Sequence, residues 1–284
     1  MPKIAFVTDS TAYLPEELIK KYEITVVPQV LIWGDQTFQD GVDILPEEFY
    51  KRLKTTKVMP TTSQVSVVTM QNTFQILIDK GYDVLGVFIS AKLSGTFQSA
   101  IQGRESLGKM SGKVSLVDSH STAMAMGFQI LIAVRAANQG ASLADCVALV
   151  ENARDHVGVY FAVDTLEFLH RGGRIGGAQR FIGSALNLKP ILALKDGHVE
   201  AEDRVRTKSR ALDRLIELVA EKVKGKSNIR LATLHANAEQ EALDLLERAC
   251  NKFNAVECVL SSVSPVVGTH AGPGTVGLAY MESM

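Results

Sequence analysis

A serine at the start of a predicted helix is the first candidate for ligand chemistry. The segment FISAKLSGTFQSA leaves an apolar, strand-like run and continues as a helix just after Ser94. We expect Ser94 at the N-cap, with the amides of Gly95 and Thr96 free at the positive end of the helix dipole. This arrangement suits one carboxylate or phosphate, although a serine here is also an ordinary helix cap.

Two further polar segments have residue types that could contact a ligand. The segment PTTSQ, residues 60–64, predicts a hydroxyl-rich turn before a helix and includes Thr62. His270 falls in a predicted loop among several glycines, and its neutral ring could hydrogen-bond a ligand oxygen. Each also has a purely structural interpretation, a capped turn in one case and a loop-filling histidine in the other.

The composition restricts the classes of partner. The chain has 30 Lys and Arg residues and 31 Asp and Glu residues, so its net charge provides no general attraction to nucleic acid. The chain enters a strand pattern at KIAFVT without a signal-type apolar region, and no run reaches the roughly 18 apolar residues of a membrane span. We therefore expect a cytoplasmic protein with at most transient membrane contact and no nucleic-acid partner.

The cysteines do not indicate a metal site. Cys146, Cys250 and Cys258 are odd in number, lack the spacing of metal ligands and lie among apolar residues. We expect three buried free thiols, which fit a reducing compartment, and no bound metal or cofactor.

The elements that position the candidate residues alternate between strand and helix. In the first half, apolar runs at 3–8, 24–33, 83–90 and 113–118 are separated by helical patterns at 64–80 and 95–107. This alternation predicts a largely parallel sheet with helices on both faces. A capping box at Ser142 and Asp145 begins a helix to about residue 156.

The second half has a different order of predicted elements, which indicates a second domain. A strand from Val157 is followed by a hairpin around Asp196 and Gly197, two amphipathic helices and three further strand patterns. We predict two α/β domains, residues 1–157 with a largely parallel sheet and residues 158–284 with a mixed sheet and helices.

A series of motifs follows in unbroken order from residue 3 to the end: VTDST, VVP, QDGVDI, PTTSQ, SAKLSGTFQSA, VDS, HRGGRIGG, RVRTKSRALDRLIELV and GTHAGPGTVGLAY. Taken together, these motifs resemble the DegV family, which implies two α/β domains with the ligand between them. The resemblance implies a non-catalytic, fatty-acid-binding subunit of a bacterial fatty acid kinase, serving phospholipid synthesis with an ATP-dependent catalytic subunit as partner. It also implies that Ser94, Thr62 and His270 hold the carboxylate, with amides from Gly95 and Thr96.

The resemblance further implies a path for the acyl chain and a docking residue. The chain is expected to run into the second domain past the apolar residues Phe168, Phe181, Ile182, Leu186, Leu188 and Ile191. Arg204 is the best match to the arginine that docks the kinase, with Arg206 as a rival. Two departures from the family pattern affect the expected pocket walls: HSTAMAMGF after VDS, and Gln29 where a small or apolar residue is usual.

Two alternatives from other classes use the same residues. Ser94 could be a nucleophile and His270 its base in a hydrolase, but Ser94 lacks a G-x-S-x-G elbow and no acidic residue is identifiable as the orienter of His270. Alternatively, the helix amides could bind a phosphorylated metabolite, which requires a short polar pocket. The chain has no GxxxxGK[ST] loop with which to bind ATP itself.

Overall fold

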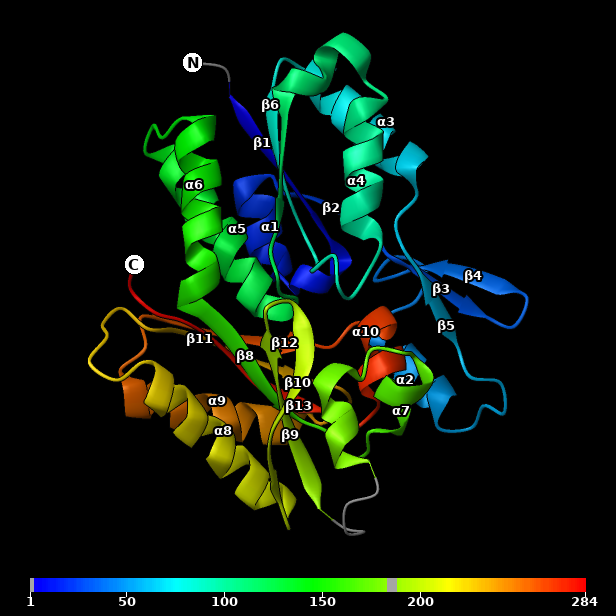
Figure 1. Cartoon of the computed structure of the whole chain (residues 1–284), viewed down its shortest axis with the longest axis vertical. Helices are drawn as coiled ribbons and strands as arrows, with labels where there is room; N and C mark the ends of the chain where they lie inside the picture. Colours follow the sequence, from blue (N-terminus) through cyan, green and yellow to red (C-terminus); the bar gives the residue numbers. More distant parts are fainter. Residues whose placement is uncertain (1–2, 183–187) are drawn as a thin grey trace.

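The computed structural model describes residues 3–182 and 188–284, and these form three sheets (Figure 1). The first sheet has four strands that are all parallel, in the order β2-β1-β6-β7. Its strands are β1 (Ile4–Asp9), β2 (Thr25–Val27), β6 (Asp83–Phe88) and β7 (Val114–Asp118). The almost continuous burial of β1 and β6 explains why their apolar runs lack polar alternation.

Helices cover both faces of this parallel sheet, as predicted. Side chains from α3 and α4 form one core with the sheet, while α5 and α6 pack against its other face. The helices of this half are α1 (Glu16–Tyr22), α3 (Val67–Asp79), α4 (Thr96–Glu105), α5 (Ala123–Asn138) and α6 (Leu143–Ala153). The expected capping box at Ser142 and Asp145 begins α6, and a short 3-10 helix extends from Arg154 to His156.

The second sheet is mixed and has six strands in the order β10-β9-β8-β13-β11-β12. β11 and β12 are parallel, whereas the other pairs are antiparallel. The strands are β8 (Val157–Ala162), β9 (Lys189–Lys195), β10 (His198–Val205), β11 (Arg230–His235), β12 (Glu257–Ser262) and β13 (Val276–Met281). β9 and β10 form the expected hairpin, and the mixed sheet agrees with the predicted fold class.

One helix joins the two larger sheets. α8 (Lys208–Lys222) and α9 (Glu239–Phe253) cover one face of the six-stranded sheet, and α5 packs on its other face while also contacting β1 and β6. A single apolar cluster therefore runs from the parallel sheet through α5 to the mixed sheet. The division at residues 157 and 158 stays a prediction. All strands of the parallel sheet lie before it, and those of the mixed sheet start at Val157.

A small antiparallel sheet was not predicted. It has the order β4-β3-β5 and consists of β3 (Val30–Trp33), β4 (Gln36–Gln39) and β5 (Thr61–Ser63). α10 (Pro265–Ala271) contacts β3 and β5, and α2 (Pro46–Leu53) and α7 (Glu167–Arg171) contact α10 (Figure 1). The expected single strand at 24–33 is therefore wrong, because Pro28 and Gln29 separate β2 from β3 and send the chain into a different sheet.

The cysteine prediction is also wrong in part. Cys250 near the end of α9 and Cys258 in β12 form a disulfide with Cα atoms 6.5 Å apart, so only Cys146 is a buried free thiol. No helix within residues 3–182 or 188–284 is long and apolar enough to cross a membrane. In the same part of the chain, no group of three or more His, Cys, Asp or Glu side chains is arranged to hold a metal ion.

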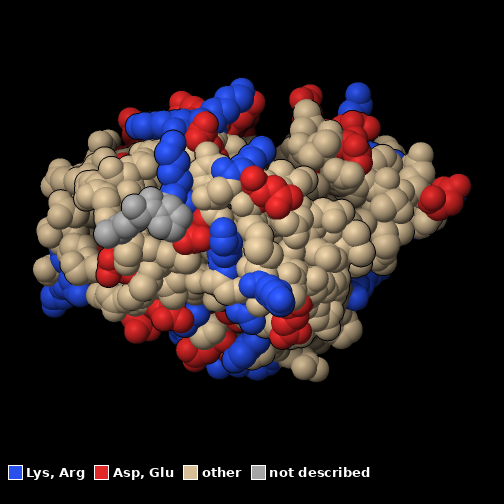
Figure 2. Space-filling view, turned by 90° about the horizontal axis from the view of Figure 1, so that it is seen from above, with Lys and Arg blue, Asp and Glu red and all other residues tan. Residues whose placement is uncertain are grey.

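Charges of both signs are distributed over the surface. Figure 2 shows one face on which basic and acidic side chains are interspersed and separated by wide uncharged areas. This view contains no broad basic surface of the kind that binds a phosphate backbone.

Candidate functional site

A cavity of about 210 Å³ lies between the parallel sheet and the mixed sheet. The loops at the carboxyl ends of β1 and β6 form one wall, which is the end of a parallel sheet where ligands usually bind. Most of the remaining lining is apolar and comes from both halves of the chain: Ile89, Leu93, Val159, Phe161, Leu169, Leu194, Val199, Leu234, Val263, Val266 and Val267.

Polar groups predicted from distant segments meet at this cavity. Thr62 Oγ1 and His270 Nε2 lie 2.7 Å apart, although the two residues are separated by 208 positions. Ser94 and Gly95 line the same cavity, so the structure brings these four predicted residues together. Thr96 is fully buried behind Ser94 and is absent from the lining, with its Oγ1 3.0 Å from Ser94 Oγ.

The local structure around these residues differs from the sequence-based expectation. Gly95 occupies the N-cap of α4, and Ser94 precedes it while accepting a hydrogen bond from the Thr96 amide at 3.3 Å. Thr62 lies in β5 opposite Leu31 and not in a turn. His270 lies in the last turn of α10 and not in a loop, so a helix and a strand pairing fix the Thr62–His270 pair.

Packing around α10 determines where His270 lies. Asp40 accepts a hydrogen bond from the Val266 amide in the first turn of α10 at 3.1 Å, and its other oxygen accepts from Ser10 Oγ at 2.6 Å. Gly172, at the end of α7, leaves space for the imidazole, because a Cβ there would lie 2.0 Å from His270 Nδ1. Neither contact could be predicted from the sequence, because in each case the two partners are remote along the chain.

His270 is neutral at physiological pH. Burial lowers its pKa to about 4, and the positive charge of Arg174 acts in the same direction. Its Nε2 contacts Thr62, while its Nδ1 is buried and has no hydrogen-bond partner among the described residues. A neutral ring can donate one hydrogen bond to a ligand oxygen without placing a cation in the cavity.

Arg174 is a site residue that sequence reasoning missed. It lines the cavity, and it donates through Nε to Leu93 O at 3.1 Å and through Nη1 to Gly172 O at 2.7 Å. A guanidinium has five N–H donors, so these two bonds leave further donors for an anion. The sequence signal for Arg174 is the segment HRGGRIGG, in which an arginine lies among glycines that allow another part of the protein to pack close to the backbone.

The arrangement does not support the hydrolase alternative. Ser94 Oγ contacts Thr96, and His270 Nε2 contacts the hydroxyl of Thr62. The orienting hydrogen bond that a catalytic base needs is missing at Nδ1 within the part of the chain that the structure describes. The cavity is also predominantly apolar, which does not fit a phosphorylated metabolite.

The predicted acyl-chain residues are only partly near the cavity. Phe168 packs against the core beside Gly272, Phe181 and Leu188 are half-buried, and Ile182 is exposed at the surface. Ile191 is fully buried on the opposite face of the mixed sheet, in the core formed with α8. Leu186 lies outside the described residues. The lining comes instead from neighbouring positions such as Phe161, Leu169 and Leu194.

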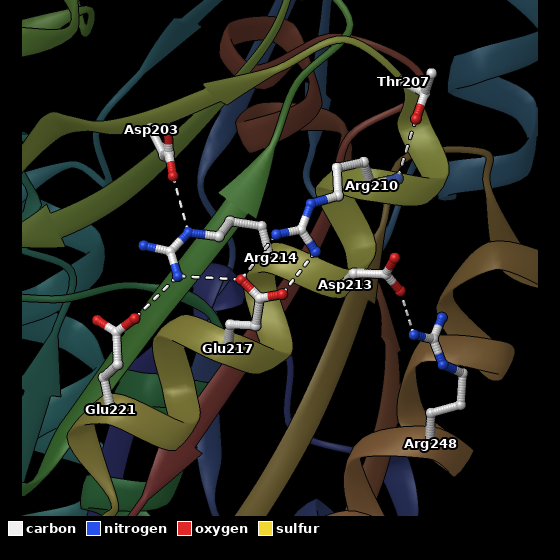
Figure 3. A network of polar contacts seen from close by, with 8 residues as sticks. All are labelled: Asp203, Thr207, Arg210, Asp213, Arg214, Glu217, Glu221 and Arg248. Carbon is white, nitrogen blue, oxygen red and sulfur yellow. Dashed lines mark hydrogen bonds and ion pairs between the residues drawn. The ribbon is translucent and has the colours of Figure 1, made fainter.

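Arg204 lies on β10 and not in the following helix. Its side chain is exposed, with the guanidinium carbon 5.2 Å from the centre of the Phe181 ring. The arginines of α8 are engaged in a network of ion pairs (Figure 3): Arg210 with Glu217, and Arg214 with Asp203, Glu217 and Glu221. Within the described residues, no ion pair includes Arg204 or its rival Arg206.

Comparisons with known proteins match DegV family members over almost the whole chain. A DegV family model, described as an uncharacterised protein family, matches residues 3–283. A DegV domain-containing protein of Halalkalibacterium halodurans is 34% identical over 283 residues, covering 99% of each chain. Protein DegV of Bacillus subtilis is 34% identical over 279 residues, covering 98% of each chain.

Solved structures share the same fold. A DegV family protein from Thermus thermophilus, described as fatty-acid binding, superposes with a TM-score of 0.93 at 34% identity, covering 99% of this chain and 100% of its own. DegV from Bacillus subtilis, also described as a fatty acid binding protein, gives a TM-score of 0.90 at 32% identity with 100% of both chains covered.

Proposed function

Because the chain belongs to the DegV family, we propose that it binds one long-chain fatty acid in the cavity between its two halves. The observation that supports this most directly is the division of the cavity: Thr62, Ser94 and His270 provide polar groups, and most of the other lining is apolar. Relatives of known structure with the same fold are described as fatty-acid binding. The carboxylate lies at the polar groups and the acyl chain along the apolar wall.

The acyl chain provides most of the affinity. Each buried methylene contributes about 0.8 kcal/mol, so about 15 methylenes contribute roughly 12 kcal/mol before ordering costs are subtracted. Donors from Thr62, Ser94, His270 and the Gly95 amide offset the desolvation of the carboxylate and fix its position. The cavity wall suggests a path past Phe161, Leu194 and Leu234, residues of β8, β9 and β11.

The protein presents the carboxylate to a separate kinase and is not itself an enzyme. A carboxylate oxygen attacks the γ-phosphorus of ATP held by the kinase, ADP leaves, and an acyl phosphate forms for phospholipid synthesis. We propose that this takes place in a bacterial cytoplasm. Arg204 is proposed to contact the kinase, because it is an exposed arginine outside the ion pairs of α8.

Calorimetric titration of delipidated protein with hexadecanoate tests the binding proposal. We expect one site, with affinity weakened about ten- to a hundredfold in Thr62→Val and in Ser94→Ala, since each loses a hydrogen bond of about 1.5–3 kcal/mol to a charged group. Ser106→Ala is the control, because this exposed serine at the far end of α4 donates only to Gln102 O. Wild-type protein that binds no fatty acid would contradict the proposal.

The kinase contact is tested separately. Arg204→Glu should bind hexadecanoate like the wild type. The hexadecanoate that it holds should be phosphorylated much more slowly by a DegV-dependent fatty acid kinase than the hexadecanoate held by the wild type. Arg210→Glu is the matched control, because Arg210 is paired with Glu217 on the same surface. Equal phosphorylation of the two variants would remove Arg204 from the docking surface.

A further inference from the structure

A buried side-chain amide in the cavity wall has an unpaired donor. Gln29, between β2 and β3, is 2% exposed and lines the cavity. Its backbone is fixed on both sides, because its N–H donates to Ser10 Oγ at 3.1 Å and its C=O accepts from the Asp40 amide at 2.9 Å. The protein alone therefore holds the position of this residue.

The amide oxygen of Gln29 is linked to the proposed carboxylate site. Its Oε1 accepts from Thr96 Oγ1 at 2.9 Å, and the same hydroxyl oxygen lies 3.0 Å from Ser94 Oγ. One threonine hydroxyl thus separates the amide from Ser94. The amide nitrogen, Nε2, is buried and has no hydrogen-bond partner within the described residues.

The neighbours of Gln29 fix which amide atom is the nitrogen. Asp9 is fully buried and accepts hydrogen bonds from Thr11 N, Thr11 Oγ1 and Ile89 N. Burial raises the pKa of Asp9, whereas these donors and the Gln29 side chain lower it. Reversing the amide would turn its oxygen toward a carboxylate and lose the bond from Thr96. One N–H directed toward Asp9 still leaves the second N–H without an acceptor.

We propose that Gln29 Nε2 donates a hydrogen bond to an oxygen of the bound ligand. The inference rests on the proposed binding of a fatty acid. Burying an N–H without an acceptor costs free energy. The hydrocarbon of an acyl chain beside Nε2 would leave this desolvation cost uncompensated, whereas a ligand oxygen would accept the hydrogen bond and remove it. Two sources provide such an oxygen: the carboxylate itself, or a hydroxyl on one of the first carbons of the acyl chain.

Binding of hexadecanoate and of 3-hydroxyhexadecanoate to wild-type protein and to Gln29→Leu distinguishes the two sources. If the carboxylate is the acceptor, Gln29→Leu weakens the binding of both acids about tenfold or more. If the hydroxyl is the acceptor, the wild type prefers the hydroxylated acid by about fivefold and the variant loses the preference. If Gln29→Leu binds both ligands at least as tightly as the wild type, the inference is wrong.

Gln129→Leu is the matched control. Gln129 is also fully buried, but it donates to Ser119 O at 3.1 Å and is absent from the cavity lining, so its replacement should leave the affinities for both ligands unchanged. A second measurement needs no variant: the side-chain amide resonances of Gln29 should shift on saturation with both acids if the carboxylate is the acceptor, or with 3-hydroxyhexadecanoate if the hydroxyl is the acceptor. Resonances that neither acid shifts would overturn the inference.

The outcomes separate this inference from the proposed function. A wild-type protein that binds neither acid contradicts both. A wild-type protein that binds both acids, while the Gln29 amide resonances shift with neither acid and Gln29→Leu binds both acids with wild-type affinity, contradicts only the role of Gln29.

Discussion

Replacing Gly172 by alanine tests how tightly the position of His270 is set by its neighbours. A Cβ at residue 172 would lie 2.0 Å from His270 Nδ1, whereas ordinary contacts of a Cβ begin at 3.4 Å. The imidazole or the end of α7 must therefore move by about 1.4 Å. The backbone of Gly172 has φ −76°, so the substitution adds a clash without adding backbone strain.

The expected magnitude follows from this clash. Overpacking of this kind costs about 1–3 kcal/mol. With an unfolding entropy of about 0.6 kcal/mol/K for a chain of this length, Tm should fall by roughly 2–5 °C. The displaced ring also loses its 2.7 Å contact with Thr62, and the loss of one hydrogen bond of about 1 kcal/mol weakens binding about fivefold.

Thermal melting and titration with hexadecanoate check both parts of the prediction. Gly112→Ala is the control, since a Cβ there meets nothing within 4 Å and its φ is not positive. The reasoning is refuted if Gly172→Ala melts within about 1 °C of the wild type and binds the ligand with unchanged affinity.

Three other predictions concern stability. The pKa of His270 is about 4 in the folded protein, whereas the unfolded ring binds a proton below about pH 6.5. The free energy of unfolding should therefore fall by up to about 3 kcal/mol as pH drops from 6.5 to 4. In urea unfolding, His270→Asn should lack this pH-dependent loss. Asp40→Ala leaves the buried Val266 amide and the half-buried Ser10 hydroxyl without their acceptor and should lower stability by about 2–4 kcal/mol, whereas Asp43→Ala, at an exposed carboxylate, should cost much less. Reducing the Cys250–Cys258 disulfide should cost about 2.5 kcal/mol in urea unfolding and leave fatty-acid affinity unchanged; equal stability with and without dithiothreitol would contradict this.

Local patterns predicted the two larger sheets well, because their strands and helices have strong sequence signals. The apolar runs of β1, β6 and β7 and the capping box of α6 depend on nearby residues alone. In the small sheet only β3 has such a signal, because it lies in the apolar run at 24–33. β5 is the polar triplet Thr61–Ser63, which forms a strand only because β3 is beside it, and that pairing is a tertiary contact.

In the candidate site, too, features that depend on neighbouring residues could be predicted, whereas contacts between distant segments could not. Spacing suggested anion binding at Ser94, but only the family resemblance joined it to Thr62 and His270. The wall of the cavity depends on strand register, which sequence alone does not determine. In β9, Leu194 faces the cavity while Ile191 faces α8, because successive side chains point to opposite faces of a strand.

The central proposal is most directly tested by native mass spectrometry of the purified protein, followed by denaturing extraction and identification of any bound molecule. We predict one fatty acid of about 14 to 18 carbons per chain, a length whose buried methylenes provide the affinity argued above, and its depletion in Ser94→Ala. A protein that is empty and also fails to take up added fatty acid would contradict the proposed function.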